Sequence, residues 1–398
     1  MPGRGKRLIA LGAIALLAPA SATAAGQRYV RCDYATAAYR IRELPFLGGV
    51  FSPSSRRLAF ADGGVLKAYR IAGRQVKPLY SPSDGGPPVS QVLQWTPRGI
   101  FFTRGAATSG RPAPDADPNR VAYGQVWVVR ADGSGPRQVR VRPPADAGTV
   151  EYGVPHVSPN GRWVGYSFLT NLQQQAGGEP INGWRLAVAR IAYAPSGRVT
   201  FRRPRFLTDD SYYNEAKDWS GDSRLLDFAS TRGEGDDRRA LNSDAFAISP
   251  RTGHITRITR APTWEEAHDL LRGDLGPRDA DAFISDRDTP NPETSPYYST
   301  PDLIPNAADS VLVATSVLAL ASWTSHQLFV SGPEGDRGWV RRLTFDYDNG
   351  NGWVARVPVW SPNGRYIRFD EWRAHGATAL GQRERLLIFD CPARRGRG

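Results

Sequence analysis

Several features that define common protein classes are absent from this sequence. No apolar run reaches the roughly 18 residues that a membrane helix needs, and the longest internal one, at 310–323, is too short. Neither a G-x-S-x-G elbow nor an H-E-x-x-H motif occurs, and the five histidines are unpaired in the sequence, at positions 156, 254, 268, 326 and 375. Hydrolase machinery of these kinds is therefore excluded, and no stretch is left over for an α/β-hydrolase domain.

The first 25 residues are predicted to be a secretory signal peptide. A cationic start, "MPGRGKR", precedes the apolar run "LIALGAIALLA" and the small-residue stretch "PASATAA". The alternative is a buried N-terminal helix. Cleavage is expected after Ala24 or Ala25, and no cysteine stands there to carry a lipid. We therefore expect an exported protein, periplasmic or secreted to the cell envelope, with no transmembrane anchor after cleavage.

The charge is strongly positive but is carried almost entirely by arginine. The formal net charge is +12, and only four lysines occur, at positions 6, 67, 77 and 217. A basic chain can bind nucleic acid, an anionic membrane or an acidic polymer. The arginines are scattered along the sequence rather than grouped, apart from the tail at 392–398. This distribution favours a compositional origin, and no nucleic-acid partner is expected.

A repeated phrase dominates the remaining sequence. It consists of an apolar or aromatic residue, Ser or Thr, Pro or Gly, a polar turn, a basic residue and an alternating strand, which together predict a β-hairpin. Four copies are clear and a fifth is shortened: "GVFSPSSRRLAFAD" (49–62), "PHVSPNGRWVGYSF" (155–168), "KDWSGDSRLLDFAS" (217–230), "PVWSPNGRYIRFDE" (358–371) and "LQWTPRGIFFTRG" (93–105).

A second pair of strands follows most copies, joined by a tight Gly turn, as in "DAFAISPRTGHITRIT" (244–259). Four-stranded meanders repeated in this way are typical of a β-propeller. The W-S-P-N-G-R hairpin with a downstream R-L-T resembles the TolB-like, WD-repeat-related propellers of bacterial envelopes. The resemblance covers residues 43–391, without the α/β domain that precedes the propeller of TolB. The pattern predicts six blades near 50–80, 90–141, 153–208, 216–259, 296–344 and from 357, with the fifth alternatively starting near 282–288 and a seventh partial blade left open.

The two ends of the chain are expected to close the ring. The last blade has three strands and then stops, whereas the strand-like run "QRYVRCDY" has no partner of its own. We therefore predict an all-β, six-bladed propeller at 43–391 whose last blade is completed by the N-terminal strand at 26–42. This pairing would bring Cys32 and Cys391 together in a disulfide, as an exported setting favours. The alternative is two free thiols.

The connections predict one plain face and one elaborated face. Turns within the A–B and C–D strand pairs are tight, whereas most B–C loops and D–A connectors are long. Binding residues tend to lie on long loops held by a rigid scaffold. In one such connector Thr263 and Glu266 form a T-x-x-E capping box, so a helix is expected at 263–271.

Candidate binding residues come from the long connections and from the starts of the inner strands. The tryptophans at the hairpin position, Trp95, Trp219 and Trp360, are expected in the core instead. The candidates are His156, Tyr212, Tyr213, Glu215, Asp218, Trp264, Glu266, Asp269, Asp346, Asp348, Trp353 and Trp372.

Metal binding is a minor alternative for this set. His156, Asp218 and Asp269 could ligate a divalent cation if they lie around a central channel, although solvated polar side chains would look the same. "DYDNGNG" (346–352) is similar to a calcium loop, but Val357 stands where an EF-hand has an acidic residue. No metal or cofactor is therefore assigned.

The leading hypothesis is a non-enzymatic binding or scaffold module, monomeric, whose elaborated face engages a protein or peptide. The alternative is a metal-dependent lyase or hydrolase acting on an anionic polysaccharide, with His156, Asp218 and an Arg-rich channel as its parts. The sequence leaves the choice between the two to the structure and to experiment.

Overall fold

The structure is a computed structural model of the chain. It describes residues 29–30, 32–105, 125–141, 151–152, 155–174, 180–209, 211–232, 243–260, 265–273, 275, 279–285, 327–332, 338–345, 353–375 and 378–392. Over these residues it contains β-strands and no helix, so the predicted all-β class is confirmed for them.

The strands form successive antiparallel meanders. The first meander contains β2 (Val50–Phe51), β3 (Arg57–Asp62), β4 (Val65–Arg70) and β5 (Gln75–Tyr80). The second contains β6 (Val89–Thr96), β7 (Gly99–Arg104), β8 (Gln125–Val129) and β9 (Arg137–Arg140). The third contains β10 (Glu151–Tyr152), β11 (His156–Val157), β12 (Trp163–Gln174), β13 (Pro180–Tyr193) and β14 (Val199–Phe206).

The second half of the chain repeats the arrangement. The fourth meander contains β15 (Asn214–Trp219), β16 (Leu226–Ser230), β17 (Asp244–Ile248) and β18 (Ile255–Arg257). The fifth contains β19 (Glu265–Leu270), β20 (Asp281–Ser285), β21 (Gln327–Ser331) and β22 (Val340–Arg342). The last contains β23 (Trp353–Trp360), β24 (Tyr366–His375), β25 (Thr378–Phe389) and the N-terminal β1 (Tyr39–Leu44).

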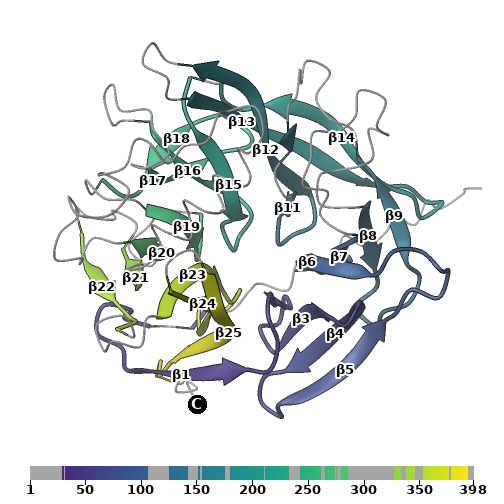
Figure 1. The fold of residues 1–398 in the computed structure, drawn as a ribbon, viewed down its shortest axis with the longest axis horizontal. Helices are drawn as coiled ribbons and strands as arrows, with labels where there is room; N and C mark the ends of the chain where they lie inside the picture. Colours follow the sequence, from purple (N-terminus) through teal and green to yellow (C-terminus); the bar gives the residue numbers. More distant parts are fainter. Residues whose placement is uncertain are drawn as a thin grey trace, which may run out of the picture.

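These meanders surround a common centre in a propeller-type ring (Figure 1). Strands β6, β11, β15, β19 and β23 lie toward the centre, and β1, β5, β14, β18 and β22 lie toward the outside. A short parallel pairing between β14 and β9 joins the second and third meanders into one nine-stranded sheet, while the other four sheets have four strands each. The six-blade count therefore stays a prediction, because this hydrogen bonding crosses one of the expected blade boundaries.

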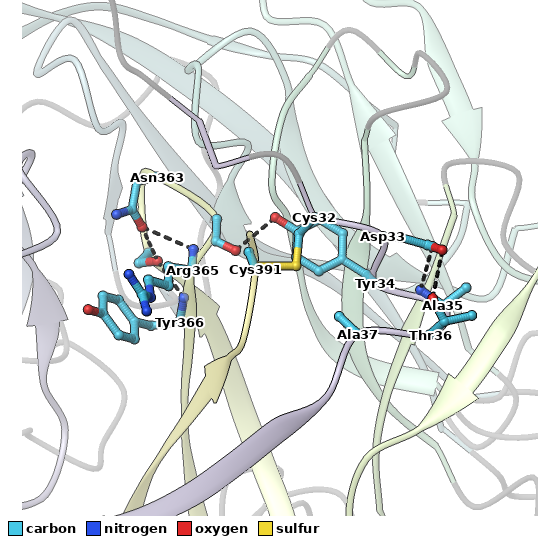
Figure 2. Close-up of a disulfide and its surroundings, with 12 residues drawn as sticks. Cys32, Asp33, Tyr34, Ala35, Thr36, Ala37, Asn363, Arg365, Tyr366 and Cys391 are labelled. Carbon is cyan, nitrogen blue, oxygen red and sulfur yellow. Dashed lines mark hydrogen bonds between the residues drawn. A yellow bond between two sulfur atoms is a disulfide. The ribbon is translucent and has the colours of Figure 1, made fainter. Parts of the chain in front are cut away.

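The chain ends meet as expected, although not through the expected residues. β1 pairs antiparallel with β25 from Tyr39↔Phe389 to Leu44↔Glu384 and becomes the outer strand of the last sheet. The strand was predicted within 26–42 and around "QRYVRCDY", but it begins at Tyr39. The segment around Cys32 instead has turn and loop structure, which the Asp33 carboxylate stabilises by accepting hydrogen bonds from Ala35 N and Thr36 Oγ1 (Figure 2).

The Cys32–Cys391 disulfide is confirmed, with the two Cα atoms 5.0 Å apart (Figure 2). It joins the loop before β1 to the second residue after β25, so it links the first and last described segments of the ring. Tyr34 anchors the same loop. Its ring is buried against Trp360 and Phe389, each 5.0 Å away between ring centroids, and its hydroxyl donates to Gly364 O at 2.7 Å.

The hairpin tryptophans lie in the core, as expected. Trp219 is 1% exposed, Trp360 4% and Trp95 5%. Each packs in a cluster that joins residues of neighbouring meanders, as Trp219 does with Leu186 and Phe228. Full burial of one large apolar side chain contributes about 1.5–3 kcal/mol, so the interfaces between meanders stabilise the ring.

The repeated hairpin turn has one position with positive φ. Gly161 and Gly364 occupy it with φ of 65° and 76°, whereas Ser55 and Ser223 occupy it with φ of 57° and 64°. A serine in this left-handed region costs about 1 kcal/mol relative to glycine. The serine hydroxyls offset that cost, because Ser223 Oγ accepts a hydrogen bond from Asn160 N at 3.0 Å in the adjacent meander.

The same contact recurs where the ring closes. Ser55 Oγ, in the first meander, accepts from Asn363 N at 3.0 Å in the last meander. In both cases an "SPNG" turn donates its backbone N–H to a serine in the next turn around the ring. The choice between serine and glycine in this motif therefore depends on the neighbouring meander.

Replacing Ser223 tests this interpretation. Ser223→Ala keeps the strained backbone and removes the acceptor of Asn160 N, so we expect the free energy of unfolding to fall by about 1–2 kcal/mol. Ser223→Gly also loses the acceptor but relieves the strain, so its loss should be smaller by about 1 kcal/mol. Urea denaturation of both variants measures the difference. Equal losses, or a larger loss for glycine, would contradict the assignment.

The helix predicted at 263–271 is wrong. Residues Glu265–Leu270 form β19, which pairs antiparallel with β20. Their sequence, "EEAHDL", repeats the "NEAKDW" of β15 at 214–219. The fifth meander therefore begins at Glu265 and not near 296, and Asp269 takes the position that Asp218 has in β15. The hydrogen bonds of the sheet outweigh the local capping-box preference.

Candidate functional site

Two inner strands carry a polar side chain at a shift in strand register. The pairing of β6 with β7 shifts between Val92 and Gln94, and that of β15 with β16 between Ala216 and Asp218. Such a shift leaves a backbone N–H without its ladder partner. Gln94 Oε1 accepts from Trp95 N at 2.9 Å, and Asp218 Oδ1 accepts from Trp219 N at 2.7 Å. These two polar groups therefore satisfy the backbone of their own strands.

In the last meander, the backbone N–H at the register shift is satisfied by a side chain from the neighbouring meander. The pairing of β23 with β24 shifts between Arg356 and Val359, and the Val359 side chain has no acceptor for the N–H of Trp360. The Asp269 carboxylate, on β19, accepts that hydrogen bond. Asp269 is 3% exposed. It therefore links two inner strands rather than pointing to solvent.

A histidine and an aspartate link β19 to β16 on its other side. His268 Nε2 lies 3.0 Å from Phe228 O, and its Nδ1 lies 3.4 Å from Asp281 Oδ1. A carbonyl oxygen only accepts, so Nε2 carries the hydrogen atom in the contact with Phe228 O. Asp227 Oδ2 accepts from Leu270 N at 3.0 Å. All these groups are fully or almost fully buried.

These side chains form a largely buried polar cluster, which we define as Asp218, Asp227, His268, Asp269, Asp281, Arg368 and Glu384. Within it, Arg368 Nη1 donates to Glu384 Oε1 at 2.9 Å. Burial raises the pKa of Asp218 to about 6 and that of Glu384 to about 7. Burial, together with a neighbouring carboxyl group, raises the pKa of Asp227 and of Asp269 well above the ordinary value.

The buried polar cluster connects neighbouring strands through its hydrogen bonds. Raised pKa values keep part of its carboxyl groups protonated near neutral pH. Two oxygens in it, Asp227 Oδ1 and Asp281 Oδ2, are buried without a hydrogen-bond partner among the described residues. Proton binding lowers the cost of burying so many carboxyl groups around Arg368 and His268.

A second group of polar side chains lies at β11 and β15 and is more accessible. We call it the rim cluster and define it as His156, Tyr213, Glu215 and Lys217. Lys217 Nζ lies 2.6 Å from Glu215 Oε2, and the Tyr213 hydroxyl also donates to that carboxylate. Glu215 keeps 33% of its side chain exposed. His156 is half-buried, and its backbone oxygen accepts from Trp219 Nε1 at 2.7 Å.

The rim cluster offers hydrogen-bonding groups that are held in place by contacts with each other. Burial lowers the pKa of His156 to about 4, with Glu215 opposing the shift and Lys217 adding to it. The imidazole is therefore neutral near pH 7. The Glu215 carboxylate already accepts from Lys217 and Tyr213. Such an arrangement can orient a polar partner through groups whose positions are already held by hydrogen bonds.

Other predicted site residues are placed differently from the expectation. Tyr213 is 8% exposed and packs edge-on against Trp184, so it is not a loop anchor. Tyr212 lies beneath the Arg232 guanidinium, 4.7 Å from its ring centroid. The Trp353 ring lies 4.1 Å from the Arg383 guanidinium, which therefore covers part of the ring that a sugar would need.

The structure does not describe every candidate. Trp264, Asp346 and Asp348 lie outside the described residues. Glu266 and Trp372 belong to β19 and β24, but only their backbone is described. Their roles in binding stay predictions.

Six residues of these clusters were not among the sequence candidates: Lys217, Asp227, His268, Asp281, Arg368 and Glu384. The expectation that all histidines are unpaired is wrong for His268, which faces Asp281. Alignment of "NEAKDW" with "EEAHDL" would have shown that Lys217 and His268 share a strand position. The pairing of His268 with β16 depends on the ring and could not be found from local sequence.

The expected ligand set for a metal is not brought together. His156 belongs to the rim cluster, whereas Asp218 and Asp269 belong to the buried polar cluster. No group of three or more His, Cys, Asp or Glu side chains in the described part of the chain is arranged to hold a metal ion.

No helix among the described residues is long and apolar enough to cross a membrane.

Comparison with known proteins gives structural similarity alone. No family model matches the chain, and no curated protein matches it. Among solved structures, TolB from Acinetobacter baumannii is similar with a TM-score of 0.43 and 14% identity, over 85% of this chain and 64% of that one. This chain thus spans under two thirds of the length of that relative.

Two further structures are comparable. Putative TolB from Agrobacterium tumefaciens has a TM-score of 0.43 and 12% identity, over 85% of this chain and 99% of that one. An oligogalacturonate lyase in complex with manganese has a TM-score of 0.42 and 13% identity, over 87% and 78%. The structural neighbours therefore include TolB and other propeller proteins at low sequence identity.

Proposed function

We propose that this chain is an exported, non-enzymatic binding module that engages a protein or peptide through the end of the ring that carries its long connections. The proposal includes a monomeric ring of six blades, with the nine-stranded sheet counted as two. Export is supported by the N-terminal signal pattern together with the Cys32–Cys391 disulfide, a bond that persists in oxidising compartments.

The observation that carries the proposal is the inequality of the connections at the two ends. At one end, β6 and β7 are joined by residues 97–98 and β23 and β24 by 361–365. At the other end, three connections are long: β7 and β8 are joined by 105–124, β16 and β17 by 231–243, and β20 and β21 by 286–326. The other three are shorter: β3 and β4 are joined by 63–64, β12 and β13 by 175–179, and β24 and β25 by 376–377. Long connections on a rigid ring are where recognition residues concentrate.

The rim cluster lies next to this long-connection end. Glu215 and Tyr213 stand at the start of β15, directly after the connector that follows β14. Their hydrogen bonds to each other and to Lys217 fix the polar groups before any partner arrives, which reduces the entropy lost on binding. The rim cluster therefore suits recognition of a polar segment of a partner.

A charge exchange tests the proposal. Glu215→Lys with Lys217→Glu keeps an ion pair on β15 but reverses its direction, and Asp209→Lys reverses an exposed charge on the connector. The protein is immobilised, exposed to cell-envelope extract, and the retained partner is quantified by mass spectrometry. We expect the triple variant to retain at least tenfold less partner than the parent, which corresponds to a loss of about 1.4 kcal/mol or more in binding free energy. Arg251→Glu, in the tight turn between β17 and β18 at the opposite end of the ring, is the control and should retain the partner.

Two results would contradict the proposal. Equal retention by the triple variant and the parent would show that the long-connection end is not the binding surface. Release of cleaved sugar from an acidic polysaccharide by the purified parent would favour the alternative, an enzyme. A stoichiometric divalent ion that is lost in His156→Ala would support that alternative further.

A further inference from the structure

The tight turns at the other end of the ring carry an arginine-rich surface. The turns at 52–57, 70–75, 96–99, 130–137, 158–162 and 193–198 belong to the first three meanders. They contain one carboxylate, Asp132. We call the exposed arginines on and beside these turns the basic band: Arg56, Arg57, Arg70, Arg74, Arg98, Arg130, Arg137, Arg162, Arg190 and Arg198.

Contacts hold together the parts of the basic band that lie on the second and third meanders. The Arg98 guanidinium, on the second meander, lies 4.5 Å from the ring centroid of Tyr193 on the third. The Tyr193 hydroxyl donates to Gly161 O at 2.9 Å, directly before Arg162. Arg137 Nη1 donates to Gly197 O at 3.2 Å, directly before Arg198. Arginines that are far apart in sequence are thus held side by side.

Asp132 is the one carboxylate on these turns, and its pKa is lowered by hydrogen bonds from Ser134 and in part by the charge of Arg130. Among the described residues, none of the ten arginines of the basic band forms an ion pair. The other half of this end differs. There Arg224 lies 3.3 Å from Asp222, Arg40 lies 2.8 Å from Asp390, and Arg341 donates to the backbone of the N-terminal loop. The free positive charge is therefore concentrated over the first three meanders.

From this arrangement we infer that the basic band docks the protein onto an anionic lipid bilayer. Guanidinium groups bind phosphate through paired donors, and arginines near an anionic membrane surface contribute about 1 kcal/mol each. The short turns of the first three meanders lie at the same end of the ring, so their arginines can contact one extended surface such as a bilayer. Sugar polymers and single-stranded nucleic acids need ring faces for stacking, but Arg98 lies over Tyr193 and Arg190 lies over Trp163, 4.9 Å from its centroid.

This inference is independent of the proposed function, because it concerns the opposite end of the ring. A protein docked through the basic band would present its long connections away from the membrane. The rim cluster would then stay accessible to a partner while the band is occupied.

Vesicle co-sedimentation of the purified, disulfide-bonded protein tests the inference. We expect binding to vesicles of phosphatidylcholine with about 30% phosphatidylglycerol and no binding to pure phosphatidylcholine. This anionic content gives a surface potential of roughly tens of millivolts. Raising the salt to about 1 M should abolish it, since the screening length shortens to about 3 Å. Arg74→Gln, Arg130→Gln and Arg162→Gln combined should weaken affinity about 100-fold.

The matched control removes three charges outside the basic band: Arg140→Gln, Arg202→Gln and Arg203→Gln on β9 and β14. All six positions are exposed, so both triple variants should melt near the parent temperature. Equal weakening by the control triple, equal binding to neutral vesicles, or no vesicle binding at all would overturn the inference. So would binding to soluble polygalacturonate or DNA at an ionic strength where vesicles are not bound.

Discussion

The Cys32→Ser/Cys391→Ser variant should lose about 5 kcal/mol of unfolding free energy. The disulfide joins residues 359 positions apart, so it removes a large part of the conformational freedom of the unfolded chain. In the folded state the same bond holds the loop before β1, where Tyr34 packs on Trp360 and Phe389. Guanidinium denaturation at neutral pH measures the loss as a lower transition midpoint.

Two controls separate the bond from the side chains. The single variant Cys32→Ser breaks the same bond and should lose as much as the double variant. Reduction of the parent by a phosphine should lower its midpoint to that of the double variant and should leave the variant unchanged. If the parent has the same denaturation midpoint when oxidised and when reduced, the disulfide does not stabilise the fold. The pairing of β1 with β25 would then be sufficient to close the ring.

The repeated hairpins could be predicted because their information is local. In "SPNGR" the turn residues fix a positive φ, as Gly161 and Gly364 show, and the alternating strand that follows fixes which side chains are buried. Ring closure could be predicted because a three-stranded last meander leaves an edge that another strand must cover. The position of β1 could not be predicted, because the stretch around Cys32, "QRYVRCDY", is as strand-like as "YRIREL", which forms β1.

The failure at 263–271 has a physical cause. A capping box stabilises a helix by about a kilocalorie per mole, whereas β19 gains pairing with β20 and hydrogen bonds to neighbouring sheets. Asp269 and His268 each bond to a different neighbouring strand. Those partners are 91 and 40 positions away, so no local pattern contains them.

The candidate site was only partly predictable for the same reason. Glu215, Tyr213 and His156 were expected on general grounds, and the structure gathers them with Lys217 in the rim cluster. Asp218 was expected beside His156, but the register shift in β15 turns it toward the backbone of Trp219. A one-residue shift in a strand reverses the side to which its side chains point, and such shifts are invisible in a single sequence.

The Arg368→Met variant should be destabilised by about 3–5 kcal/mol at pH 8. Arg368 is 6% exposed and Glu384 is fully buried, with Arg368 Nη1 2.9 Å from Glu384 Oε1. Removing the guanidinium leaves a buried carboxylate that accepts only from Gly48 N at 3.0 Å. Circular-dichroism denaturation at fixed ionic strength measures the loss.

The loss should depend on pH in a defined direction. Burial raises the pKa of Glu384 from 4.5 to about 7, so the parent binds this proton more tightly when folded, and its unfolding free energy falls as the pH rises from about 4.5 to 7. Without Arg368 the pKa of Glu384 rises further. At pH 5 the carboxyl is protonated in both proteins, so the loss should be clearly smaller than at pH 8.

A double variant distinguishes an unpaired charge from lost packing. Arg368→Met with Glu384→Gln keeps an acceptor for Gly48 N and removes the buried charge, so we expect it to recover most of the stability at pH 8 and to lose the pH dependence. A double variant as unstable as Arg368→Met would show that the arginine stem, rather than its charge, supports the contact between β24 and β25. In that case the pH dependence would have to come from Asp218, Asp227 and Asp269, which share the buried polar cluster.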